Sequence, residues 1–204
     1  MLSITLNKEE IDAIDLEPSK SYIQGHENVK YFNLPAGQEH YKLLAYIANQ
    51  LPKGSVVYDI GTYLGFSALA WSRNPNIKVV TYDIGNYIQN KEAFDGIINL
   101  ERRIGNCIMD AEEIVERSQV IMIDVGPHDG IQEVAMLKAF VATGFKGIML
   151  FDDIYANEPM YKFWQSINIP GTTKLDLTSV GHFSGTGAIV WDGVAEIKMN
   201  TPSL

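Results

Sequence analysis

The chain has 204 residues, a mass of 22.8 kDa and a formal net charge of −9. Hydrophobic residues make up 46% of it and charged residues 20%, a balance that excludes a wholly disordered chain and suits one α/β domain. The excess of acidic residues disfavours a nucleic acid as partner, because tracking a phosphate backbone requires clustered Lys and Arg.

Three further absences narrow the class. No apolar run approaches the ~18 residues that a membrane helix needs, so we expect no membrane partner. The residues after Met1 lack the basic and then apolar layout of a signal peptide. The single cysteine, Cys107, excludes an internal disulfide and a cysteine-rich zinc site. We therefore expect a cytoplasmic protein.

The predicted elements begin with a polar stretch, residues 1–35, that we expect to be irregular or partly helical. Apolar spacing predicts a helix over 37–51, ended by Pro52 and Gly54. Short apolar runs then alternate with amphipathic segments, which is typical of a parallel sheet covered by helices on both faces. The predicted strands are 55–60, 77–83, 102–107, 119–125 and 146–152, and the predicted helices are 66–73, 92–100, 110–117, 131–141 and 159–167. Asp110, with Glu113 three residues later, is the expected N-cap of its helix.

The pattern changes after Pro170 and Gly171. Residues 172–180 and 188–191 look like two strands with no helix between them, so they should pair antiparallel. We therefore predict an α/β fold, Rossmann-like and doubly wound, with a seven-stranded, mostly parallel sheet and a C-terminal antiparallel hairpin. Within one domain, residues 1–51 should form a segment that packs on or covers the site, and residues 52–204 should form the core.

Ligands of open α/β sheets bind at the carboxyl ends of the strands. Gly61 and Gly65 follow the first core strand, where they allow a sharp turn, but their G-x-x-x-G spacing is neither a dinucleotide fingerprint nor a P-loop. Asp83 ends the next strand, 22 positions after Gly61, and is well placed to bind ribose hydroxyls. Asn106 and Cys107 could line an adenine ring. The alternative for Asn106 and Cys107 is a plain turn, and the alternative for Asp83 is an acid that only faces solvent.

Carboxylates follow the fourth and fifth core strands. Asp124, Asp152 and Asp153 should converge there, and clustered carboxylates need a cation or donors to stay ionised. A hard ion such as Mg²⁺ would keep the three carboxylates ionised. In the alternative, one aspartate caps the following helix and another faces solvent, so that no ion is bound. His128 lies beside them and is a candidate general base, with a structural hydrogen bond as its alternative. His182 could face the same site at the carboxyl ends of the strands, or it could face only solvent. We assign no role to His40.

These residues resemble a known family. Asp59-Ile-Gly-Thr-Tyr-Leu-Gly65-Phe-Ser67, Thr81-Tyr-Asp83, Val120-Ile-Met-Ile-Asp124 and Leu150-Phe-Asp-Asp153 have the order and spacing seen in class I S-adenosylmethionine-dependent methyltransferases. The match runs from about Pro52 to Trp191 and is nearest to small-molecule O-methyltransferases of the sugar- and antibiotic-tailoring group. The family fold has seven strands with a reversed final hairpin, in agreement with the pattern above.

The resemblance implies an enzyme that methylates a hydroxyl group of a small molecule, with S-adenosylmethionine as cofactor. It implies cofactor binding by Asp59, Gly61, Tyr63, Gly65, Ser67, Asp83, Asn106 and Asp124. It implies catalytic roles for His128, as base, and for Asp124, near the reacting centre. Metal-dependent members hold Mg²⁺ with acids that match Asp124, Asp152 and Asp153, but Val125 stands where such relatives often carry an acid, so Mg²⁺-assisted and metal-free reactions both stay open.

Two rivals belong to other classes. An NAD-dependent oxidoreductase would share the glycine turn and Asp83, but the glycine spacing and the terminal hairpin disfavour it. A non-catalytic cofactor-binding module would keep the fold and lack an acceptor site. The identity of the acceptor cannot be read from the chain, and a homo-oligomer is compatible with the short fold.

Overall fold

The structure is a computed structural model that describes residues 1–23, 32 and 34–200. A seven-stranded sheet, ordered β4-β3-β2-β5-β6-β8-β7, forms its centre. Its strands are β2 (Val56–Ile60), β3 (Lys78–Asp83), β4 (Leu100–Ile104), β5 (Val120–Ile123), β6 (Ile148–Asp152), β7 (Thr172–Asp176) and β8 (Thr186–Trp191). The strands from β2 to β6 pair in parallel, and β8 runs antiparallel to both β6 and β7. The predicted fold class and the terminal hairpin are confirmed.

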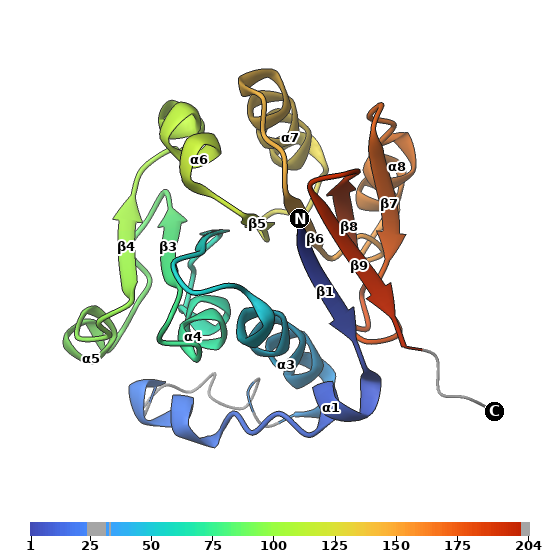
Figure 1. The fold of residues 1–204 in the computed structure, drawn as a ribbon. Coiled ribbons are helices and arrows are strands. Elements are labelled where there is room, and N and C mark those ends of the chain that lie inside the picture. Colours follow the sequence, from blue (N-terminus) through green and yellow to red (C-terminus); the bar gives the residue numbers. More distant parts are fainter. Residues whose placement is uncertain (24–31, 33, 201–204) are drawn as a thin grey trace.

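Helices cover both faces of this sheet (Figure 1). One face carries α3 (Pro35–Gln50), α4 (Phe66–Ser72) and α5 (Lys91–Asp95), and the other carries α6 (Ala111–Arg117), α7 (Ile131–Thr143) and α8 (Glu158–Ser166). Side chains alternate between the two layers along each strand: Val57 and Val79 pack into one core, whereas their neighbours Tyr58 and Val80 pack into the other. The order of the strands along the chain reverses between β2 and β5, which marks the place where a site is expected.

The two ends of the described chain form a ribbon that the sequence did not predict. Strand β1 (Leu2–Leu6) pairs in parallel with β9 (Ala195–Met199), and Figure 1 shows the ribbon beside the central sheet. The expectation that residues 1–35 are irregular or partly helical is therefore wrong for β1, although α1 (Lys8–Asp12) and a 3-10 helix, η1 (Glu17–Ile23), follow it. A five-residue strand is stable only with a partner, and this partner lies at the other end of the chain.

Local structure differs from the prediction around residues 92–117. The helix expected over 92–100 ends at Asp95, with Gly96 as its C-cap, and Leu100 already begins β4. The strand expected over 102–107 therefore lies earlier, and Cys107–Asp110 forms a 3-10 helix, η3. The predicted capping box is wrong as well. Asp110 occupies the N-cap of α6, but its carboxylate accepts from Tyr82 Oη at 3.0 Å instead of from the helix.

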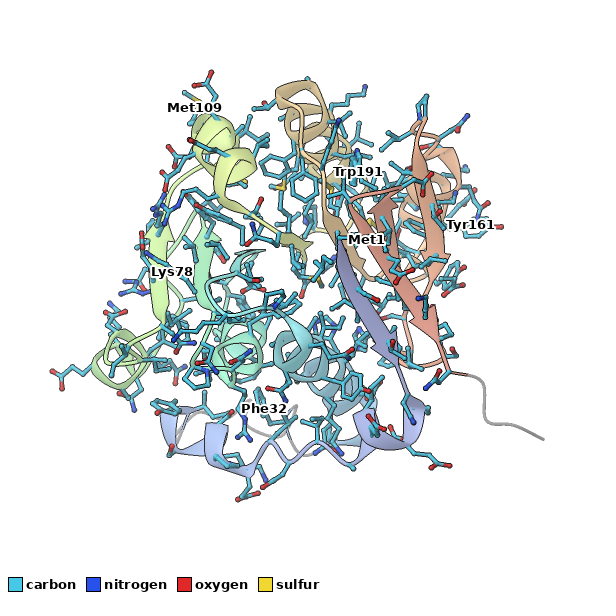
Figure 2. All side chains as sticks on the ribbon, in the orientation of Figure 1. Met1, Phe32, Lys78, Met109, Tyr161 and Trp191 are labelled. Carbon is cyan, nitrogen blue, oxygen red and sulfur yellow. The ribbon has the colours of Figure 1, made fainter. Side chains whose placement is uncertain are left out.

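The N-terminal segment packs under the core through an aromatic contact. Phe32 is fully buried, stacks on Tyr41 of α3 with ring centroids 4.6 Å apart and meets Phe66 of α4 edge-on at 5.0 Å; Figure 2 shows Phe32 beneath these helices. Trp71, Trp164 and Trp191 are buried in the core, as expected. Over the described residues, no helix is long and apolar enough to cross a membrane.

Candidate active site

The carboxyl ends of the parallel strands open into a cavity of about 770 Å³. Eight of the predicted site residues line it: Gly61, Tyr63, Asp83, Asn106, Asp124, His128, Asp152 and Asp153. Helix α3 also contributes Gly37, His40 and Tyr41 to the lining. Three predicted residues, Asp59, Gly65 and Ser67, lie behind the lining.

Asp59 lies under the turn that follows β2. It is 1% exposed and accepts hydrogen bonds from Ser67 Oγ at 3.0 Å and from Thr81 Oγ1 at 2.9 Å. Burial raises the pKa of its carboxyl group to about 6, although these two donors oppose the rise. The side chain therefore ties the start of α4 and strand β3 to β2. In the structure, Asp59 and Ser67 shape the loop from below instead of facing the cavity.

The loop itself is held close to the end of β5. Gly61 has a φ of +109°, and a Cβ at this position would stand 1.6 Å from the main-chain oxygen of Asp124. Gly65, at the N-cap of α4, also has a positive φ, and its Cβ would clash with the ring of Phe94. Both positions therefore require glycine, for conformation and for space.

Asp83 lines the cavity from the end of β3. Its Oδ2 accepts from the main-chain N–H of Tyr63 at 2.7 Å, and its Oδ1 accepts from that of Gly85 at 3.1 Å. Each carboxylate oxygen keeps a further lone pair. The carboxylate is thus fixed in place and can still accept from a ligand with two neighbouring hydroxyl groups. The ring of Tyr63 stands 5.7 Å from that of Tyr87, centroid to centroid, on the same side of the cavity.

Asn106 and Cys107 line the cavity next to Asp83. The side chain of Asn106 accepts from the main-chain N–H of Ile108 at 3.0 Å and so caps η3. Cys107 is buried, and burial raises the pKa of its thiol to about 12. This thiol stays protonated at neutral pH, which fits the expected lining role and not a nucleophile.

The opposite end of the cavity is densely charged. Its side chains form two groups in which the donor atoms lie within 4.8 Å of one another: His40, Asp152 and His182 in the first, and Asp124, His128 and Asp153 in the second. The three acids expected to share one Mg²⁺ are thus divided between the groups: Asp152 belongs to the first, and Asp124 and Asp153 belong to the second. Asp153 follows the last residue of β6, and its Oδ1 also lies 3.5 Å from His182 Nδ1.

In the first group, two histidines flank one carboxylate. His40 Nδ1 lies 3.3 Å from Asp152 Oδ1, and His182 Nδ1 lies 3.2 Å from Asp152 Oδ2. Burial raises the pKa of Asp152, but the two histidines outweigh it and hold this pKa below its usual value. Burial lowers the pKa of His182, but hydrogen bonds to Asp152 and Asp153 outweigh it and raise the value to about 10. The proton on His182 therefore persists at neutral pH.

In the second group, one histidine lies beside two carboxylates and makes an ion-pair contact with one of them. His128 Nε2 lies 3.5 Å from Asp153 Oδ2, and Ser184 Oγ donates to Asp153 Oδ1. Both His128 and Asp153 have a left-handed φ, +58° and +59°, a strained conformation that often marks functional positions. Burial and the nearby Asp152 carboxylate raise the pKa of Asp124 well above its usual value.

His40 and His182 are the site residues that the sequence analysis missed or left open. His40 lies on a helix before the core, where nothing in its spacing separates it from an ordinary helical histidine. His182 carries a weak signal, because it lies in the glycine-rich loop between β7 and β8, and the structure places it in the cavity and not in solvent.

No protein-family model matches this chain, and no curated protein matches it in sequence. Solved structures do match its fold. A methyltransferase of Podospora anserina, PaMTH1, crystallised with S-adenosylhomocysteine, superposes with a TM-score of 0.66 at 18% identity, covering 87% of each chain. The O-methyltransferase TomG of Streptomyces achromogenes, in complex with S-adenosylmethionine, gives 0.61 at 14% identity, covering 92% of this chain and all (100%) of TomG. An O-methyltransferase of Bacillus cereus with S-adenosylhomocysteine gives 0.55 at 17% identity, covering 91% and 92%.

These likenesses identify the fold. The chain has the Rossmann-like fold of S-adenosylmethionine-dependent O-methyltransferases over about nine-tenths of its length. A strand running antiparallel between β6 and β7 separates this sheet from the six-stranded dinucleotide-binding one. The fold expected from the sequence resemblance is therefore confirmed.

Proposed function

We propose that this protein is an S-adenosylmethionine-dependent methyltransferase that methylates a hydroxyl group of a small molecule. The observation that carries the proposal is the fixed carboxylate of Asp83 in the lining of a 770 Å³ cavity, in a sheet with the methyltransferase strand order. A cavity of this volume is of the size that encloses a ligand of several hundred daltons.

The lining residues fit the cofactor from one end of the cavity to the other. Asp83 would accept from the two ribose hydroxyls, with Asn106 beside the base and Tyr63 over the glycine loop. Because residue 61 is a glycine, the loop after β2 can contact the main chain of Asp124, and the loop therefore does not fill the space that the cofactor would occupy. Asp59, Gly65 and Ser67 would act by holding the loop in this shape. Asp124 would lie beside the reacting centre.

When bound, S-adenosylmethionine supplies a methyl group already activated on a sulfonium sulfur. The chain has then to hold an acceptor oxygen in line with that methyl, and such positioning can supply ~7–11 kcal/mol of barrier reduction. It has also to accept the hydroxyl proton, which contributes typically ~10²–10⁴-fold. His128 is our candidate for this base, with Asp153 facing its Nε2 at 3.5 Å and setting the ring orientation.

His182 is a poor candidate for the same task. Its pKa of about 10 keeps the ring protonated at neutral pH, so that it can donate but not accept a proton. An Mg²⁺ ion held jointly by Asp124, Asp152 and Asp153 does not fit the donor set either. Asp152 faces two imidazoles, and Mg²⁺ prefers oxygen ligands. No step of this proposal passes through Mg²⁺.

Calorimetry and a transfer assay test the proposal. We expect saturable binding of S-adenosylmethionine and of S-adenosylhomocysteine, and no binding of NADH under the same conditions. Label from methyl-tritiated S-adenosylmethionine should then appear in at least one member of a panel of hydroxylated small molecules, and not in a reaction without protein. Failure to bind either form of the cofactor would refute the proposal, whereas tight binding without transfer to any acceptor would favour a non-catalytic module.

A further inference from the structure

His40, Asp152 and His182 form a largely buried group in which several polar atoms lack a hydrogen-bond partner. His40 is 3% exposed and Asp152 is 5% exposed. Although His40 Nδ1 lies 3.3 Å from Asp152 Oδ1, the contact lacks the geometry of a hydrogen bond. As a result, both ring nitrogens of His40 and Oδ1 of Asp152 have no hydrogen-bond partner among the described residues. Leaving a buried polar atom unpaired typically costs ~1–3 kcal/mol.

These atoms have the spacing of ligands around one cation. His40 Nδ1 lies 3.3 Å from Asp152 Oδ1 and His182 Nδ1 lies 3.2 Å from Asp152 Oδ2, and one ligand atom from each of the three side chains lies within 4.8 Å of the others. Ligands at ~2.0–2.1 Å from a tetrahedral ion lie ~3.3 Å from one another. The rings of His40 and His182 are 5.5 Å apart, centroid to centroid, so the two imidazoles stand on either side of the carboxylate. All three side chains line the cavity, which would leave a coordination position open to a ligand.

From this geometry we propose that His40, Asp152 and His182 form a binding site for a divalent transition-metal ion of the Zn²⁺ type. Two imidazoles and one carboxylate suit Zn²⁺, Co²⁺ or Fe²⁺, whereas Mg²⁺ and Ca²⁺ take all-oxygen sets. The ion would occupy the place of the proton that balances Asp152 in the metal-free protein.

Two other features of the described chain lack such unpartnered buried atoms or a cluster of charged groups. The second group, Asp124, His128 and Asp153, has no buried side chain without a partner, and it already serves the proposed reaction. The open hollow between α1, β1 and α3 carries no cluster of charged or nucleophilic groups, since Glu10 there is bound by Tyr46.

The test uses the full chain without a histidine tag, stripped of metal by a chelator. Titration with Co²⁺ should give visible absorption bands of the intensity typical of four-coordinate cobalt, saturating at one ion per chain. Zn²⁺ should displace Co²⁺, and Mg²⁺ in large excess should not. His40→Gln and His182→Gln should each weaken Co²⁺ binding by more than ~10-fold. Loss of a residue that only supports a ligand already lowers metal affinity by ~10- to 100-fold, and loss of a ligand should lower it at least as much. Circular dichroism and thermal melting would establish that each variant is folded.

Three results would overturn this inference: no saturable Co²⁺ binding by the wild-type chain, displacement by Mg²⁺ as readily as by Zn²⁺, or unchanged affinity in folded His182→Gln. His182 lies in a surface loop and is the variant expected to fold even if His40→Gln does not. His128→Gln is the matched control, since it removes a histidine from the neighbouring group and should leave Co²⁺ affinity intact. If Co²⁺ affinity fell only in His128→Gln, the ion would be assigned to the group of Asp124, His128 and Asp153, and the inference would be wrong. Metal binding is measured without any methyl transfer, so this test and that of the proposed function fail independently.

Discussion

The main chain of Gly61 lies so close to the carbonyl of Asp124 that a Cβ would stand 1.6 Å from its oxygen. This contact joins the loop after β2 to the end of β5, at the point where the strand order reverses. It fixes the depth of the cavity floor, because the loop can approach β5 only when residue 61 has no side chain.

Gly61→Ala should therefore lower the free energy of unfolding by more than the backbone strain of a positive φ would. Gly54→Ala is the matched control, since Gly54 also has a positive φ, +86°, and a Cβ there would meet nothing within 4 Å. We expect Gly54→Ala to lower the free energy of unfolding by ~1–2 kcal/mol, and Gly61→Ala to lower it by several kcal/mol more and to weaken cofactor binding. Urea unfolding measures both. Equal losses for the two variants would mean that the loop relaxes and the close approach has no importance.

Asp83→Asn should weaken binding of S-adenosylmethionine by roughly 10- to 100-fold. The amide oxygen can still accept from one of the two main-chain N–H groups, that of Tyr63 or that of Gly85. The substitution removes a charged acceptor for ribose, and hydrogen bonds to charged groups contribute ~1.5–3 kcal/mol. Glu116→Gln, an exposed acid on α6, removes the same charge far from the cavity lining and should leave the affinity unchanged. Calorimetry would measure both affinities. An unaltered dissociation constant in Asp83→Asn would show that Asp83 does not bind the ribose.

Much of this fold could be predicted because its signals are local. Alternating apolar runs placed the five parallel strands, and the chain from Thr172 to Trp191 showed two strands with no helix between them. Strand β1 escaped prediction because its stability comes from β9 at the far end of the chain. The capping box at Asp110 failed because a tyrosine hydroxyl from β3 competes for the carboxylate. Such contacts between distant segments leave no periodicity in the sequence.

The candidate site divides in the same way. Asp83, Asn106 and Asp124 could be predicted to lie at the cavity because they directly follow strands, and strand ends meet at one edge of the sheet. His40 could not, since it is brought there by the packing of α3. Asp152 and Asp153 are adjacent in sequence and were expected to act together. They share a contact with His182, but Asp152 also faces His40 whereas Asp153 also faces His128, a division that their adjacency does not reveal.

Asp59→Asn should change how stability depends on pH. The folded protein raises the pKa of Asp59 from 3.8 to about 6, so the native state binds this proton more tightly than the unfolded chain does. The stability that Asp59 contributes is thus fully present below pH ~4 and is lost as the pH rises through about 6. We expect the free energy of unfolding of Asp59→Asn, relative to wild type, to increase by ~2 kcal/mol between about pH 4 and pH 7.

Urea titrations at several pH values would measure this difference. The amide oxygen of Asn can still accept from Ser67 or Thr81, so the variant is expected to fold. Parallel pH profiles for the two proteins would contradict the prediction, and they would mean that the two hydroxyl donors fully compensate for the burial of the carboxylate.

His128→Gln should lower kcat for methyl transfer by ~10²–10⁴-fold, the usual contribution of a general base, with little effect on the affinity for S-adenosylmethionine. Asp153→Asn should reduce kcat less, because Asp153 acts through the orientation of the His128 ring, which it faces at 3.5 Å. Asp129→Asn, in the same loop but outside the cavity lining, removes one negative charge and should leave the rate unchanged. A wild-type rate in His128→Gln would assign proton removal to another group, and a fall in the Asp129→Asn variant as large as that in Asp153→Asn would show that loop integrity, not the position of the His128 ring, accounts for the loss.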